Sequence, residues 1–266
     1  MFRNILVFVL GVSIFLGLSA KNAEAAIKSQ KVVYMVGAKE FTGYLAFDDS
    51  ISGKRPGVIV VHEWWGHDAY ARKRADMLAS QGYTALALDM YGTGVLAEHP
   101  KDAGAFAKEA SKNPDVKKAR FLAALDKLKK HGTVNASKTA AIGYCFGGSV
   151  VLDMARAGID LDGVVSFHSS LGLSIKPKLG GVKAKVWVFH GGADKFVKKK
   201  NLDNFLAEME TTGADFKFIS YPGVVHSFTN PEATARGRKF KLPLAYNAEA
   251  DTDSWNQTMD FFKSIF

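Results

Sequence analysis

The chain has 266 residues, of which 47% are hydrophobic and 23% are charged, so a disordered or collagen-like polypeptide is excluded. Cys145 is its only cysteine, which excludes intramolecular disulfides and zinc sites with two or more thiolates. The 35 lysines and arginines exceed the 26 acidic residues, for a net charge of +9. This excess is compatible with anionic surfaces or substrates, but the basic residues are scattered without interleaved aromatics, and we expect no nucleic-acid partner.

The N-terminal segment predicts export. Arg3 is followed by an apolar run from Ile5 to Ala20 and by the small-x-small sequence Ala23-Glu24-Ala25, the pattern of a secretory signal peptide. A membrane anchor is the alternative, but the apolar run is shorter than the ~20 residues that span a bilayer. We predict a signal peptide over 1–25 and one exported domain over 26–266. This domain is expected to be periplasmic or secreted, monomeric and without a stable membrane anchor.

Predicted strands and helices alternate along the rest of the chain. Two β-rich runs, 32–36 and 41–47, are expected to pair antiparallel. Short apolar runs predict buried strands over residues 57–61, 84–88, 139–142, 164–167, 186–189 and 216–220. Helical patterns cover residues 67–81, 98–112, 115–131, 145–156, 202–212 and 252–266. This order predicts an α/β fold, with a mostly parallel sheet and helices on both faces.

The stretch from Thr229 to Asp251 is the loosest part of the sequence. It is rich in polar residues and contains Pro231, Gly237 and Pro243. We expect a long surface loop here, and such loops often act as lids over functional sites.

The most informative motif is Gly143-Tyr144-Cys145-Phe146-Gly147, between a predicted strand and a predicted helix. It is the G-x-nucleophile-x-G turn with cysteine in place of serine. Small residues on either side let the strand and helix approach closely, and the helix N-terminus favours a thiolate. The N–H of Phe146 would then be one oxyanion-hole donor. A buried structural cysteine beside a glycine-rich turn is the alternative interpretation.

Two later segments supply an acid and an imidazole. Asp194 follows the strand predicted over 186–189, and His226 follows the strand predicted over 216–220. The order nucleophile, acid, histidine, each after a successive strand, is that of α/β-hydrolases. His226 would shuttle the proton, while Asp194 would fix its tautomer and stabilise the imidazolium.

The loop after the first buried strand reads His62-Glu63-Trp64-Trp65-Gly66. In α/β-hydrolases this loop supplies the second oxyanion-hole donor, which here would be the N–H of Trp64. His62-Glu63 also suggests a zinc site, but a zincin helix needs two histidines four residues apart. The next histidine is His67, five residues on, so we expect no metal.

These segments together resemble the dienelactone hydrolase family of α/β-hydrolases, which includes carboxymethylenebutenolidase, over about residues 30–266. The resemblance is carried by His62–Gly66, Asp89-Met90-Tyr91-Gly92, Gly143–Gly148, Gly192-Ala193-Asp194 and His226-Ser227-Phe228. It implies an α/β-hydrolase fold and a triad of Cys145, His226 and Asp194. It also implies that Glu63 is a carboxylate beside the thiol, which in the family contacts the resting cysteine and helps deprotonate it once substrate enters.

The substrate-binding residues depart from the dienelactone-specific members of that family. Those enzymes grip the substrate carboxylate with two arginines, and Thr93 and Asn230 stand at these positions here. The departure argues against dienelactone as the substrate, unless Arg236 or Arg238 takes over the role. Aromatic residues suggest an apolar pocket wall, although a core position is the favoured alternative for each of them. Besides Trp64 and Tyr246, the candidates are Trp65, Tyr91, His168 and Phe228.

The sequence thus predicts an exported hydrolase that cleaves a small ester or lactone through an acyl-cysteine intermediate, with no metal or cofactor. The alternative is a non-catalytic small-molecule binding protein on a hydrolase scaffold, which the complete set of catalytic groups argues against. A redox role for Cys145 is less favoured, because no second cysteine is present to resolve a sulfenic acid.

Overall fold

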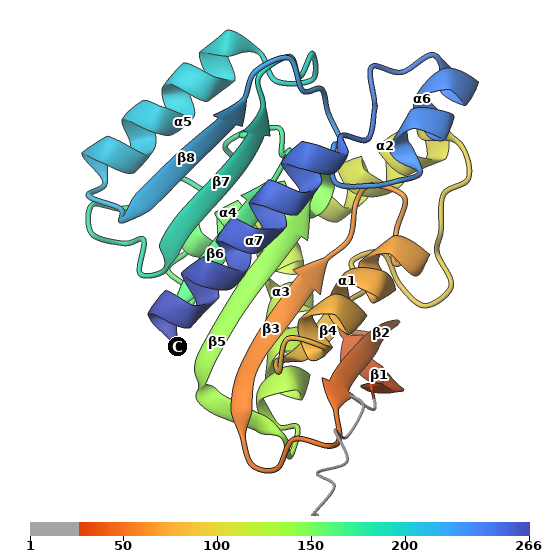
Figure 1. Ribbon diagram of the computed structural model, residues 1–266, viewed down its shortest axis with the longest axis vertical. Helices are drawn as coiled ribbons and strands as arrows, with labels where there is room; N and C mark the ends of the chain where they lie inside the picture. Colours follow the sequence, from red (N-terminus) through yellow and green to blue (C-terminus); the bar gives the residue numbers. More distant parts are fainter. Residues whose placement is uncertain (1–26) are drawn as a thin grey trace, which may run out of the picture.

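The computed structural model describes residues 27–266, and the predicted signal peptide lies outside them. Within these residues, eight strands form one sheet: β1 (Ile27–Val36), β2 (Lys39–Asp48), β3 (Arg55–Val61), β4 (Thr84–Leu88), β5 (Val134–Tyr144), β6 (Gly163–Phe167), β7 (Lys185–Gly191) and β8 (Phe216–Tyr221). Their order across the sheet is β1-β2-β4-β3-β5-β6-β7-β8 (Figure 1). β2 pairs antiparallel with β1 and with β4, and all the other pairs are parallel. The predicted antiparallel start and parallel remainder are confirmed.

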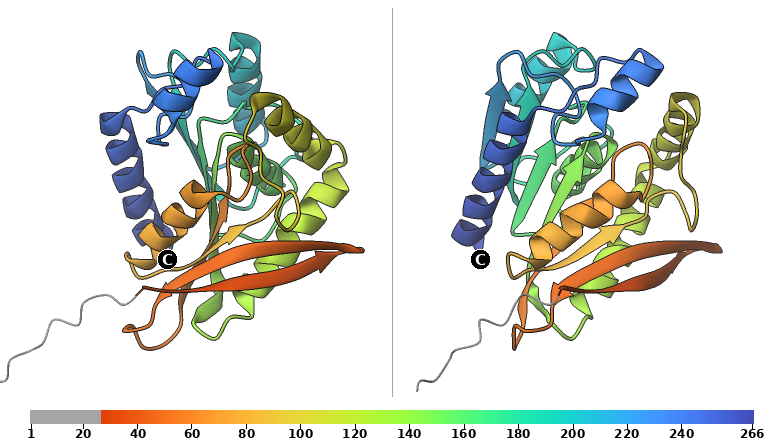
Figure 2. Two further views of the ribbon diagram at one scale, coloured as in Figure 1. Left: turned by 90° about the vertical axis from the view of Figure 1, so that its right-hand side faces the viewer. Right: turned by 45° about the vertical axis from the view of Figure 1, so that its right-hand side comes forward.

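The helices cover both faces of the sheet, as predicted. They are α1 (Ala69–Ala79), α2 (Pro100–Ser111), α3 (Pro114–Lys129), α4 (Phe146–Arg156), α5 (Lys199–Thr211), α6 (Ala233–Phe240) and α7 (Ala248–Ile265). Figures 1 and 2 show α1 and α7 on one face and α3, α4 and α5 on the other. Within residues 27–266, no helix combines the length and apolar character that a bilayer span would require.

Each face of the sheet has its own hydrophobic core. Along β3, Val58 and Val60 belong to the core under α1 and α7, whereas Ile59 and Val61 belong to the core under α3 and α4. All four side chains are fully buried. Because successive side chains of a strand point to opposite faces, a strand covered on both sides is apolar at every position. This explains the continuous apolar runs in the sequence.

The parallel strands bring the candidate residues to one edge of the sheet. The His62–Gly66 loop leaves the carboxyl end of β3, Cys145 leaves that of β5, and Asp194 and His226 follow β7 and β8. In open α/β sheets, ligands bind outside these carboxyl ends.

The prediction of a long loop over 229–251 is wrong in part, because this stretch contains α6. The helix has no apolar stripe in the sequence, and of its residues only Ala233 and Gly237 are buried. Gly237 packs so tightly on the 242–244 segment that a Cβ there would collide with the Leu244 carbonyl. Tertiary packing therefore stabilises a helix that hydrophobic periodicity does not reveal.

Candidate active site

Cys145 occupies a strained turn between β5 and α4. Its φ of 53° and ψ of −113° are rare for a residue with a side chain and cost on the order of 1–3 kcal/mol. Two glycines make the turn possible. A Cβ on Gly143 would collide with the backbone of Gly147, and a Cβ on Gly147 would collide with the carbonyls of Val61 and His62. The spacing of the motif is thus a steric requirement of the turn.

Asp194 and His226 form a buried pair beside this turn. His226 Nδ1 lies 2.7 Å from Asp194 Oδ2, and the two side chains are 7% and 0% exposed. Cys145 and His226 line the same cavity, and Cys145 is one of the groups that raise the pKa of the imidazole. The structure therefore brings a sulfur, an imidazole and a carboxylate together from the ends of three strands.

The surroundings of His226 favour its protonated form. Burial by itself lowers the pKa of this imidazole, but the charge of Cys145 and the hydrogen bond to Asp194 outweigh burial and raise the pKa to about 10. Since Nδ1 faces Asp194, Nε2 is the nitrogen left for Cys145. That is the orientation in which an acid–imidazole pair exchanges a proton with a nucleophile.

Two backbone amides beside Cys145 are free to bind an oxyanion. Within residues 27–266, the N–H groups of Trp64 and Phe146 donate to no backbone acceptor. The Trp64 loop is held by His62, whose Nδ1 lies 2.6 Å from the Glu63 carbonyl and whose Nε2 accepts the Met90 N–H at 3.1 Å. His62 is therefore a neutral residue that fixes the loop, a role that sequence analysis did not assign to it.

Glu63 is fully buried, and neutral groups bind it. Ser227 Oγ donates to Glu63 Oε1 at 2.8 Å, and Asn230 Nδ2 donates to Oε2 at 2.6 Å. Burial raises the pKa of Glu63 above its ordinary value, and the hydrogen bonds from Asn230 and Ser227 act in the opposite direction. Among the described residues, no hydrogen bond joins Glu63 to Cys145, in contrast to the contact that the family resemblance implies.

A cavity of about 260 Å³ opens over Cys145. Its walls come from five apolar residues, three serines and two of the candidate catalytic residues: Trp64, Ala107, Phe146, Phe196 and Leu244; Ser111, Ser149 and Ser170; Cys145 and His226. Phe196 and Leu244 were not foreseen, because neither belongs to a motif. Phe196 packs on the His226 ring, with a centroid distance of 4.9 Å.

The four other candidate substrate-binding residues do not line this cavity. Trp65, Tyr91, His168 and Phe228 are each at most 3% exposed and lie in the layer behind it. Trp65 packs on Trp64, Tyr91 on Phe146, and His168 on His226, at ring distances of 5.1, 5.4 and 5.2 Å; Phe228 packs on His168 at 5.3 Å. They are core residues that support the lining, the alternative that the sequence had left open.

Comparison with known proteins agrees with this geometry. The model of the dienelactone hydrolase family matches residues 41–266. The chain belongs to the dienelactone hydrolase family. By family it is a carboxylic ester or lactone hydrolase.

Relatives of this hydrolase cover between 78% and 91% of the chain. "Protein usf" of Aquifex pyrophilus is 32% identical over 215 residues, which are 78% of this chain and 87% of that protein. The crystal structure of P91, a dienelactone hydrolase-like promiscuous phosphotriesterase from metagenomic libraries, is 32% identical with a TM-score of 0.84 and covers 91% of this chain and 99% of its own. The structure named m3DLH is 35% identical with a TM-score of 0.86 and the same coverage.

Thr93 and Asn230 stand where the dienelactone-specific members carry arginine, and both bind residues other than a substrate. Thr93 lies away from the cavity and donates to Glu40 at 3.1 Å, while Asn230 is bound to Glu63. Arg236 does not replace the missing arginines, because its Nη2 lies 3.4 Å from Asp68 and its guanidinium stacks 4.6 Å from the Trp65 ring. Arg238 is exposed on α6 and does not line the cavity either.

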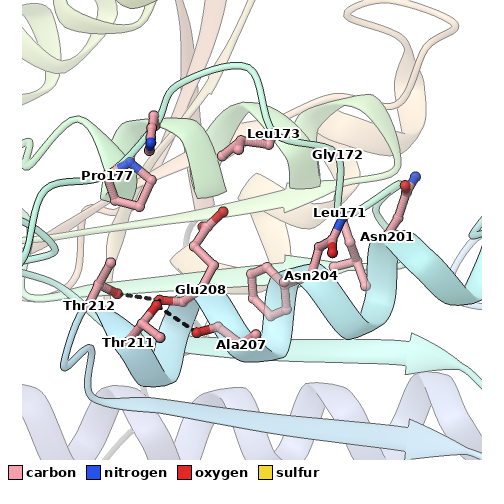
Figure 3. A pocket seen from close by; sticks show the side chains of 12 residues that line it. Leu171, Gly172, Leu173, Pro177, Asn201, Asn204, Ala207, Glu208, Thr211 and Thr212 are labelled. Atoms are coloured by element: carbon pink, nitrogen blue, oxygen red, sulfur yellow. Dashed lines mark hydrogen bonds between the residues drawn. The ribbon is translucent and has the colours of Figure 1, made fainter.

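A second, larger cavity of about 440 Å³ lies between α5 and residues 171–177. Figure 3 shows its lining, which includes Asn201, Asn204, Glu208 and Thr211. None of the predicted catalytic residues lines it. Within residues 27–266, no group of three or more His, Cys, Asp or Glu side chains is arranged to hold a metal ion.

Proposed function

We propose that this hydrolase cleaves a small carboxylic ester or lactone by acyl transfer to Cys145, with His226 as the base and Asp194 as the residue that orients it. One observation carries the proposal: the hydrogen-bonded Asp194–His226 pair and Cys145, on its strained turn, meet at the same cavity. Family membership supports the ester or lactone as the bond that is cleaved.

The proposed mechanism has two halves. His226 Nε2 takes the proton of the Cys145 thiol, and Sγ attacks the carbonyl carbon. The N–H groups of Trp64 and Phe146 hold the oxyanion, each such donor being worth about 10²–10³ in rate. The tetrahedral intermediate collapses, and the leaving alkoxide takes the proton held by His226. Water, deprotonated by His226, then attacks the acyl-cysteine; the acid leaves, and His226 returns the proton to Cys145 Sγ, which restores the thiol.

Cys145→Ala tests the nucleophile. We expect turnover of p-nitrophenyl acetate to fall by about 10³-fold or more, and iodoacetamide to inactivate the wild-type enzyme while labelling Cys145. Full activity of Cys145→Ala would refute the acyl-cysteine. A burst of product from the wild-type enzyme would dispose of the alternative, a non-catalytic small-molecule binding protein, whereas no p-nitrophenol release at all would favour it.

We also propose that the chain is exported, that its signal peptide is removed by cleavage between Ala25 and Ala26, and that the mature protein is a monomer. The proposal is supported by Arg3, the apolar run that follows it and the small-x-small sequence before Ala26. We expect N-terminal sequencing of the protein from the periplasm or medium to begin at Ala26, and light scattering to give the mass of one chain. A cytoplasmic full-length chain would contradict the export proposal.

A further inference from the structure

We propose that the site takes uncharged, compact esters or lactones and discriminates against substrates that carry an anionic group near the reacting carbonyl. This inference rests on the proposed function and names the substrate class of the same site. It is carried by the lining of the cavity over Cys145, by the charges of the catalytic groups proposed above and by the partners of three arginines.

The cavity offers an anion no counter-charge. None of its ten lining residues is a lysine or an arginine, although the chain has 35 of them. The apolar wall of Trp64, Phe146, Phe196 and Leu244 cannot replace the hydration shell of a carboxylate. Burying an ionised group without a partner is strongly unfavourable, so an anionic substrate would bind weakly or react outside its productive position.

The reacting groups add no excess positive charge. Cys145 and Asp194 are acids and His226 is the only base among them, so the ionised set carries at most one positive charge against two negative ones. His226 is already hydrogen-bonded to Asp194. Glu63, buried behind the Trp64 loop, is a further acid. Beyond the reach of the two amides that bind the oxyanion, these side-chain charges therefore disfavour an incoming carboxylate.

Three arginines that contact the core around the site are bound to other groups. Arg74 Nη2 lies 2.5 Å from Asp251, and Arg120 Nη1 donates to the Met90 carbonyl at 2.8 Å. Arg236 lies between Asp68 and the Trp65 ring; its Nη1 is buried without a partner, but the residue does not line the cavity. Bringing any of them to the substrate would break contacts that it already makes.

The polar side of the cavity consists of hydroxyl groups, which suit an uncharged substrate. Ser149 Oγ and Ser170 Oγ lie 3.0 Å apart, and Ser111 lies at the end of α2. A hydroxyl can donate to a neutral carbonyl or ether oxygen and accept from a neutral amide. An apolar cavity of about 150 Å³ holds benzene, so about 260 Å³ accommodates one six-membered ring with a short substituent.

An isosteric substrate pair tests the inference. 4-Acetoxybenzamide is neutral and 4-acetoxybenzoate is an anion of nearly the same shape, and each kcat/KM is divided by the rate of alkaline hydrolysis to remove the difference in leaving group. We expect the amide to be preferred by about 10- to 100-fold, the range for a charged group that loses its hydrogen bonds. Raising the salt concentration should narrow this ratio, because it screens the repulsive part.

Ser111→Arg places a cation on the cavity wall at the C-terminal end of α2, where the helix dipole tolerates positive charge. We expect it to shift the ratio toward the benzoate by about 10-fold, while Ser111→Gln, a polar side chain without charge, leaves the ratio unchanged. Ala107→Lys, one turn earlier on α2 and also on the lining, repeats the test if the arginine variant does not fold.

The outcomes separate the two proposals. Equal use of both substrates, or preference for the benzoate by the wild-type enzyme, overturns the inference and leaves the hydrolase function standing. A ratio that does not move in folded variants with an added cation also overturns it. Hydrolysis of neither substrate, together with Cys145 that iodoacetamide does not label, overturns the proposed function itself.

Discussion

The cavity beside α5 and the cavity over Cys145 are formed by different kinds of segments. The cavity of about 440 Å³ is lined by one helix and one loop, and the hydroxyls of Thr211 and Thr212 donate to carbonyls of their own helix. The cavity of about 260 Å³ collects Trp64, Cys145 and His226 from loops that follow three different strands. The smaller cavity is the one with reactive groups aimed at a common point. The smaller cavity is the candidate active site because potentially reactive side chains meet there, although its volume is the smaller of the two.

Backbone strain marks the same difference. Cys145, His168 and Ser227, all within or directly behind the smaller cavity, have positive φ angles of 53°, 39° and 57°. Of the residues lining the larger cavity, only Leu171 does, at 57°. Each such residue costs about 1–3 kcal/mol, and three of the five non-glycine residues with positive φ in residues 27–266 lie at or directly behind the smaller cavity.

The largest expected effect is a difference in kcat between a variant at the smaller cavity and a variant at the larger one. Asp194→Asn removes the charge that orients His226 and stabilises its protonated form, and we expect kcat for p-nitrophenyl acetate to fall by about 10²–10⁴-fold. Asn204→Ala in the larger cavity is expected to change kcat less than about 2-fold, because the residue is an exposed helix position. Similar losses in both variants would break the comparison.

A pair of glycine substitutions tests the strained turn. Gly147→Ala forces a methyl group onto the Val61 and His62 carbonyls, and we expect the free energy of unfolding to fall by about 3 kcal/mol. Gly104→Ala is the control, since a Cβ there meets nothing within 4 Å and its helical position favours alanine by about 0.5–1 kcal/mol. Urea denaturation measures both. An unchanged stability of Gly147→Ala would show that the turn can relax.

Asn230→Ala tests the hydrogen bond that holds Glu63. Removing the amide leaves one oxygen of a buried carboxyl group unpaired, and we expect a loss of about 1–3 kcal/mol in unfolding free energy. Asn204→Ala again serves as control, because it removes an exposed amide. If both asparagine variants lose the same stability, Asn230 has no special role at Glu63.

The smallest effect concerns the pKa of His226. Because Cys145 helps to raise this pKa to about 10, we expect Cys145→Ala to lower it, as an NMR titration of the imidazole would show. The raised pKa stabilises the folded state fully below the ordinary value of about 6.5, and this contribution is lost as the pH rises through about 10. Between about pH 6.5 and about pH 10, Cys145→Ala should therefore lose less unfolding free energy than the wild-type protein does. An unchanged His226 pKa would mean that the sulfur and imidazole do not interact.

Local patterns made most of the fold predictable. The strand over 57–61 is continuously apolar because two helical layers cover it, and the spacing of Gly143 and Gly147 around Cys145 is a steric rule that operates over five residues. The helix α6 escaped prediction because few of its side chains are buried. Phe196 and Leu244 escaped because reaching the cavity depends on the course of two loops, for which neither residue carries a sequence signal.

From the sequence alone came the α/β class, the turn at Cys145 and the chain order of sulfur, carboxylate and imidazole, since periodicity and motif spacing are short-range properties. Only the tertiary structure decided which aromatic rings reach the cavity and which stand behind it. It also decided that Ser227 and Asn230, 164 and 167 residues away in the chain, bind Glu63. Such partnerships depend on strand register and on how loops from different strands pack, and neither is encoded in any local pattern.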